Sequence, residues 1–141
     1  MLNAVDGSDA ATRQKLTATL DPLFPAKTFE KNWLLCETLV YLQAPATAAK
    51  GMALIAAAPT QEEQMEYARS LRMLRAGWTK ETRSAQPEWF LRAANFRGGA
   101  SFEKFTEFIR TDARATVTEP GKTEFAALTE REAEKKSVTE N

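Results

Sequence analysis

The chain has 141 residues with 19 basic and 19 acidic side chains, so its formal net charge is zero. This length suits one domain with a single core. The balanced charge argues against a nucleic-acid or anionic-membrane partner, because those partners require a basic excess, and no run approaches the roughly 18 apolar residues of a membrane span.

The sequence contains no histidine and a single cysteine, Cys36. Histidine is the commonest general base near neutral pH, the commonest metal ligand and the usual haem axial ligand. Cys36 lies among Trp33, Leu39 and Val40, so we interpret it as a small buried hydrophobe. We therefore expect no catalytic residue, no metal ligand and no cofactor site in this chain.

The first helix is predicted to begin at Ser8 and to end at Leu20. Pro22 and Pro25 follow, and two prolines so close together cannot lie in a helix interior. Between and beside them, Leu23 and Phe24 are predicted to be held in the core.

Thr28 can cap a second helix that runs to about Leu42. Its apolar residues cover most of the circumference, which is typical of a helix buried on several sides. We therefore predict that this helix is the centre of the core. Pro45 then suits the first position of an alanine-rich helix, in which Gly51 suggests crowding because glycine costs about 1 kcal/mol of helix propensity.

The stretch from Pro59 to Thr79 has the clearest start and stop signals. Thr60 and Glu63 have the spacing of a capping box, with bonds in both directions. Gly77 suits a left-handed residue just past the helix end, followed by a contact of Trp78 with Met73. The buried stripe is predicted to consist of Tyr67, Ala68, Leu71 and Leu74. We expect the next helix to pack beside this one as a tight hairpin.

Thr79 can cap a helix that runs to about Asn95, with Trp89, Phe90 and Ala93 on one side. Pro87 lies well inside this span and is predicted to kink or break the helix.

A connector over residues 97–99 is followed by a helix that Ser101 can cap. We predict that Phe102, Phe105 and Ile109 form its core face, with Phe108 adjoining. A break is expected at residues 118–121. We assign residues 1–125 to a single helical-repeat domain and residues 126–141 to an exposed helix or disordered tail.

Residues 28–44 align with residues 60–76 at an offset of 32. The matched pairs are Thr28 and Thr60, Glu30 and Glu62, Leu39 and Leu71, Leu42 and Leu74, and Ala44 and Ala76. Helix pairs repeated at such a period indicate a solenoid of the HEAT or armadillo type; the alternative is a chance alignment of two amphipathic helices. No segment alternates with period two, so the predicted fold class is all-α, with stacked helical hairpins in a short solenoid of about six to seven helices.

Several of these motifs occur together in one order. They are Leu20-Asp-Pro-Leu-Phe-Pro-Ala-Lys27, Leu39-Val-Tyr-Leu-Gln-Ala-Pro45, Ala58-Pro-Thr-Gln-Glu-Glu-Gln64, Ala76-Gly-Trp-Thr79, Gly98-Gly-Ala-Ser-Phe102 and Ile109-Arg-Thr-Asp-Ala113. From about Asp9 to Phe125, the chain resembles the HEAT-like helical-repeat segment of the large multidomain haem-binding proteins, with c-type cytochrome domains, that are typical of planctomycetes and their relatives.

That resemblance implies a fragment or truncated relative of a protein involved in electron transfer. In the family, a propeller-like domain that resembles a dehydrogenase and the repeats precede the cytochrome domain. The Cys-x-x-Cys-His motif that holds the family's haem does not occur in this sequence, so the resemblance transfers no haem-binding residue. It also implies an extracytoplasmic (periplasmic) location, although no signal peptide is recognisable at the N-terminus.

We therefore expect a non-catalytic helical scaffold or spacer, not an enzyme, whose partner is a protein or a neighbouring domain. The alternative is a stand-alone protein–protein interaction module, with a candidate surface near Arg69, Arg72 and Trp78. A third hypothesis, an enzyme that uses the carboxylates of Glu62, Glu63 and Glu66, is weaker, because helix capping and solvation explain these residues better.

Overall fold

A computed structural model describes residues 10–96, 99–116, 123 and 125. Within these residues the regular elements are six α-helices and one short 3₁₀ helix, with no strand, which confirms the all-α fold class. In chain order they are α2 (Ala10–Leu20), the 3₁₀ helix η1 (Asp21–Leu23), α3 (Phe29–Tyr41), α4 (Thr47–Ala57), α5 (Gln61–Leu71), α6 (Lys80–Ala93) and α7 (Gly99–Thr116).

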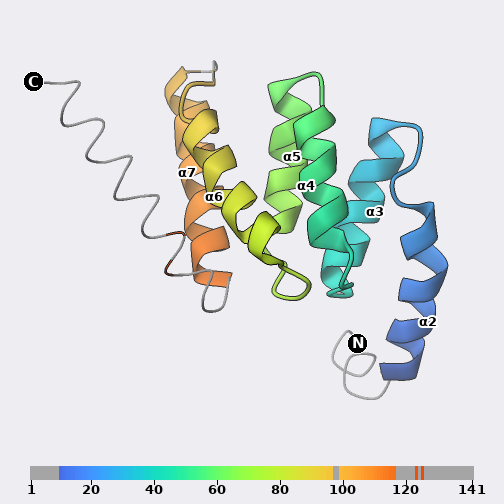
Figure 1. The fold of residues 1–141 in the computed structure, drawn as a ribbon. Helices are drawn as coiled ribbons and strands as arrows, with labels where there is room; N and C mark the ends of the chain where they lie inside the picture. Colours follow the sequence, from blue (N-terminus) through green and yellow to red (C-terminus); the bar gives the residue numbers. More distant parts are fainter. Residues whose placement is uncertain (1–9, 97–98, 117–122, 124, 126–141) are drawn as a thin grey trace, which may run out of the picture.

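The helices follow one another across the molecule, from α2 at one end to α7 at the other (Figure 1). Helix α5 packs against α3, α4 and α7, and α6 packs against α4 and α7. The prediction that α3 is the central helix was wrong, because α5 holds that position. Although α3 buries Cys36, Leu39 and Val40, it leaves Leu34 57% exposed and Tyr41 45% exposed.

The predicted helix caps are formed. The Thr28 hydroxyl accepts a hydrogen bond from the backbone amide three residues on, and Thr60 accepts one from the Glu63 amide at 3.1 Å. The structure contains only this one of the two bonds expected for a capping box at Thr60. A box with both bonds starts α6 instead, between Thr79 and Thr82.

Helix α5 ends at Leu71, earlier than its sequence predicts. Gly77 has the predicted left-handed backbone, with φ of +80°, but it lies in the connection over residues 72–79 and not at the helix end. The Trp78 indole N–H donates to the Leu74 carbonyl at 2.8 Å, whereas Met73, its predicted contact, is 53% exposed. The prediction that α5 and α6 form a tight hairpin was also wrong, since α6 packs chiefly against α4 and α7.

Two further predictions in the first half need adjustment. Phe24, which follows the 3₁₀ helix, is buried as expected, but Leu23 at the end of that helix is 56% exposed. Pro45 lies in a turn, and α4 begins at Thr47.

The crowding at Gly51 is confirmed: a Cβ atom there would lie 2.9 Å from both δ-methyl groups of Leu71. The proposed cap Ser8 lies outside the described residues.

Pro87 does not break α6, which is continuous from Lys80 to Ala93. The predicted core face is confirmed, since Trp89, Phe90 and Ala93 are all buried. The proline ring itself is fully buried. A proline inside an isolated helix costs about 3 kcal/mol, and in α6 this proline is packed in the core.

Helix α7 begins at Gly99, so Ser101 lies inside it rather than capping it. Among its described side chains, the buried ones are Thr106, Ile109 and Ala113, while Phe105 is 40% exposed and Phe108 71% exposed. With 3.6 residues per turn, positions 106 and 113 lie on the same face of the helix as Ile109. The sequence prediction gave too much weight to aromatic residues.

Phe125 belongs to the core, with its ring 5.8 Å from that of Phe90. The Phe102 side chain, the break at residues 118–121 and the tail at residues 126–141 lie outside the described residues.

Candidate interaction surface

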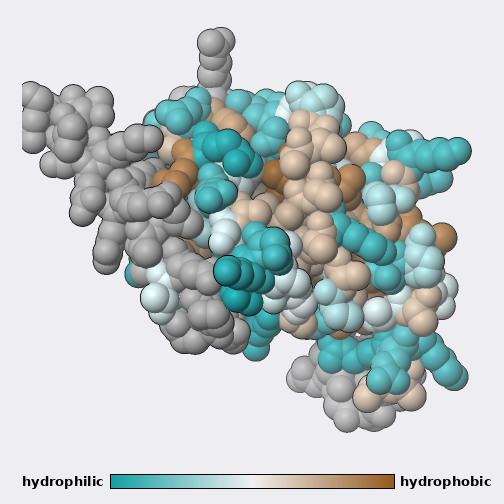
Figure 2. All heavy atoms as spheres, in the orientation of Figure 1, coloured by the Kyte–Doolittle hydropathy of each residue, from teal (hydrophilic) through white to brown (hydrophobic). Residues whose placement is uncertain are grey.

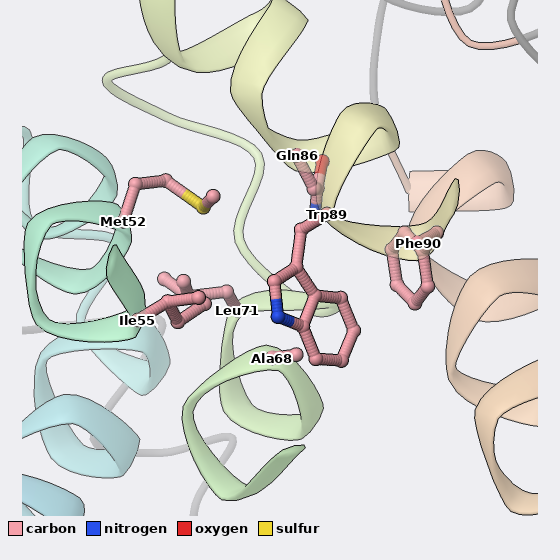
Figure 3. Close-up of a pocket in the computed structure, with 7 residues that line it drawn as sticks. All are labelled: Met52, Ile55, Ala68, Leu71, Gln86, Trp89 and Phe90. Carbon is pink, nitrogen blue, oxygen red and sulfur yellow. The ribbon is translucent and has the colours of Figure 1, made fainter. Parts of the chain in front are cut away.

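The space at the junction of α4, α5 and α6 is part of the core. It is lined by Met52, Ile55, Ala68, Leu71, Gln86, Trp89 and Phe90 (Figure 3). These side chains leave no room for a water molecule. The Trp89 indole N–H is satisfied by the Gln64 side-chain oxygen at 3.0 Å. This junction therefore holds three helices together and is not a ligand pocket.

An open groove of about 290 Å³ lies between α3 and α5. It is lined by Glu37, Val40, Tyr41, Arg69, Ser70, Arg72 and Met73. Two of the three residues predicted for an interaction surface, Arg69 and Arg72, are therefore brought together in one concave site.

Both arginines join neighbouring helices. The Arg69 Nε lies 3.3 Å from the Glu66 carboxylate, and its Nη2 lies 3.6 Å from that of Glu37 in α3. The Arg72 Nε lies 3.4 Å from the carboxylate of Asp112 in α7. These separations exceed the 2.7–2.9 Å of strong charge-assisted hydrogen bonds. The pairs are partly exposed, so each contributes at most about 1 kcal/mol to stability.

Two polar groups of the groove residues are buried without a hydrogen-bond partner in the described structure. They are the Ser70 hydroxyl oxygen and the Arg72 Nε. Ser70 as a whole is 7% exposed. A buried polar group left without a partner costs about 1–3 kcal/mol. For Arg72, the carboxylate of Asp112 at 3.4 Å offsets part of this cost by charge attraction.

The apolar side of the groove is formed by Val40, Tyr41 and Met73. The Arg13 guanidinium of α2 donates to the Tyr41 backbone carbonyl at 3.2 Å and lies 6.0 Å from the centre of its ring. Tyr41 is thereby held at the end of α3, while the Met73 side chain is 53% exposed beyond the end of α5.

Large exposed hydrophobic side chains do not occur on α4 or α6 in the described part of the chain. Weakly hydrophobic residues gather over α4, with hydrophilic residues around them (Figure 2). The exposed residues of α4 include Ala53, Ala56 and Ala57. The groove between α3 and α5 is therefore better suited to binding a partner than this alanine surface.

Trp78, the third predicted site residue, does not line the groove. Its ring packs against the core, and its N–H bonds the Leu74 carbonyl, so it stabilises the connection after α5. The sequence analysis missed Tyr41 and Met73. Their signal was weak, because exposure of an apolar residue at a helix end cannot be read from helical periodicity.

The described residues contain no group of three or more acidic or cysteine side chains placed to hold a metal ion. Cys36 is buried, and burial, with a smaller contribution from Glu37, raises the pKa of its thiol to about 12. A thiolate nucleophile is therefore disfavoured at neutral pH. Among the described helices, none has the length and apolar character needed to cross a bilayer.

Comparison with models of protein families, with curated proteins and with solved structures finds no match for this chain.

Proposed function

We propose that the chain is a non-catalytic helical scaffold or spacer, built as a short HEAT-like stack of repeats, that holds a protein or a neighbouring domain in place. The observation that carries this proposal is the contact between two turns that occupy equivalent positions in the two copies of the repeat. The α3–α4 turn contains Gln43, and the turn after α5 contains Arg75 and Ala76.

Gln43 joins these turns with its side-chain amide. Its oxygen accepts hydrogen bonds from the backbone amides of Arg75 at 2.8 Å and Ala76 at 3.2 Å. Its nitrogen donates to the carbonyls of Val40 at 2.9 Å and Met73 at 3.1 Å. In stacked repeats, each unit contacts the next through corresponding parts, and a bond between residues 43 and 75 matches the repeat offset of 32.

The resemblance to the repeat segment of multidomain c-type cytochrome proteins fits a spacer role. Absorption spectroscopy of the purified chain tests it, and we expect no Soret band. We also expect no turnover of sugar or alcohol substrates. A haem spectrum or a measurable turnover would overturn the scaffold proposal. An open reading frame that continues into a Cys-x-x-Cys-His domain would support membership of the family and an extracytoplasmic location.

The second candidate function is a stand-alone protein–protein interaction module. The groove between α3 and α5 favours it, because an apolar side chain beside two arginines is a common composition for the centre of an interface. Both functions require a protein partner, and they differ in whether that partner lies in the same chain.

A further inference from the structure

We propose that α2 is a strap at the end of the stack, which opens and closes as a unit while α3 to α7 stay folded. In the closed position, Arg13 of α2 holds Tyr41, which lines the groove between α3 and α5. Opening of α2 therefore frees one side of that groove. This motion is independent of the proposed scaffold function, because it depends only on contacts within the chain.

Helix α2 is attached to the rest of the fold by very little apolar burial. Helices α3, α4, α5 and α6 each bury at least four residues, whereas α2 buries none. It lies at the end of the row of helices and packs against α3 and η1 (Figure 1). Arg13, Thr17 and Leu20 are partly buried, and of these Leu20 packs against the hydrophobic core. Apolar burial is the dominant favourable term in folding, so α2 can open without loss of the core.

Helix α2 also has little stability of its own. It has 11 residues, and isolated helices shorter than about 12–15 residues are marginal in water. Its first turn contains no acidic residue and its last turn no basic residue, so charged side chains in these turns do not offset the helix dipole. Separation from α3 therefore also unfolds α2, which makes the opening one cooperative local step.

Arg13 supplies the contact that holds the closed position. Its guanidinium donates to the Tyr41 backbone carbonyl at 3.2 Å and lies 6.0 Å from the centre of the Tyr41 ring. Tyr41 is the last residue of α3, whose last turn contains no basic side chain. The carbonyls at the end of a helix lack partners within the helix and attract a cation. Arg13 therefore provides from α2 the cation that the last turn of α3 lacks.

The pivot of the motion lies where α2 continues into η1. The Lys50 ammonium of α4 lies 3.1 Å from the Asp21 carboxylate and donates to the Asp21 carbonyl at 2.9 Å. Phe24, which follows η1, is 1% exposed. These contacts do not involve α2, so the chain after Leu20 stays in place when α2 opens. Opening then removes Arg13 from the Tyr41 ring and leaves the core unchanged.

Amide hydrogen exchange of the full chain, measured by NMR at urea concentrations too low to unfold it, tests the motion. We expect the amides of α2 to be protected about 100-fold less than that of Leu71 in α5. We also expect their exchange to depend little on urea, because a local opening exposes little surface. Protection of α2 equal to that of Leu71, with the same urea dependence, would overturn the proposal. A complete lack of protection would do so too, since α2 would then have no closed position.

Two variants on α2 separate its contact with α3 from its helix propensity. Arg13→Ala removes the contact with Tyr41, whereas Lys15→Ala changes an exposed position of the same helix. Both replace a long basic residue with alanine, the better helix former. We expect Arg13→Ala to lower the protection of the α2 amides about tenfold and Lys15→Ala not to lower it. Equal effects of the two variants would show that Arg13 does not hold the closed position.

A variant at the other end of the stack separates local opening from global unfolding. Ile109 is fully buried in α7, and Ile109→Val removes one methylene group while keeping an apolar side chain in the core. We expect it to lower the protection of Leu71 about fivefold. The protection of α2 should stay unchanged, because the open state of α2 retains the contacts of Ile109. An equal loss at α2 and Leu71 would show that α2 opens only when the whole chain unfolds.

Discussion

Gly77 lies directly against the backbone of Pro45, the residue 32 positions earlier in the chain. A Cβ atom at position 77 would lie 2.1 Å from the Pro45 carbonyl oxygen, and the φ of Gly77 is +80°. The two turns can approach this closely only because position 77 has no side chain. This contact fixes the spacing of one turn against the other.

Gly77→Ala is expected to destabilise the chain by about 2–4 kcal/mol, because both the clash with rigid backbone and the positive φ oppose a side chain. Gly51→Ala is the matched control. Its Cβ would meet only the flexible end of the Leu71 side chain at 2.9 Å, and its gain of about 1 kcal/mol in helix propensity offsets part of the cost. Urea unfolding measures both, and equal losses would contradict the role of the Pro45 contact.

Gln43 gives a second test of the contact between turns. Gln43→Ala removes the acceptor for two backbone amides, and we expect a loss of about 1–3 kcal/mol in the free energy of unfolding. Gln43→Gly also removes the amide, but glycine suits the φ of +55° at this position. We therefore expect Gln43→Gly to lose less stability than Gln43→Ala. The reverse order would show that the positive φ costs little here, and an unchanged stability of Gln43→Ala would show that the side-chain amide contributes little.

Much of this fold could be predicted from local sequence signals. Thr28, Thr60 and Thr79 mark helix starts because the chemistry of a cap depends only on nearby residues. The crowding at Gly51 was also readable, since glycine inside an alanine-rich helix is costly without a close neighbour.

Features that depend on residues far apart in the sequence could not be predicted from local sequence signals. Helix α5 ends at Leu71, because the following residues are used in bonds to Gln43, which is far away in the sequence. The exposure of Phe108 depends on which neighbours α7 meets. The groove likewise requires α3 and α5 to be side by side, so Arg69 and Arg72 were predicted as a surface but Tyr41 and Met73 were not.

Cys36 is expected to react with thiol reagents at pH 8 only when the chain unfolds. Its pKa is raised from 9.0 to about 12, first by burial and then by Glu37. Labelling with a chromogenic disulfide should be slow in buffer and rapid in urea. Rapid labelling of the folded chain would contradict the burial of this side chain.

The same shift predicts a pH dependence of stability. The folded pKa lies above the ordinary value of 9.0, so the contribution of the protonated Cys36 thiol is fully present below about pH 9 and is lost as the pH rises toward 12. The slope from this group is at most about 1.4 kcal/mol per pH unit. Cys36→Ala should show a shallower loss over this range, and parallel curves for the two proteins would contradict the prediction.

Ser70→Ala tests whether the buried hydroxyl costs stability. The Ser70 hydroxyl is buried without a partner, so its removal eliminates an unsatisfied group, and alanine is also the better helix former. We expect the free chain to gain about 1 kcal/mol in unfolding free energy by urea denaturation. A loss of stability would show that the hydroxyl has a partner within the fold.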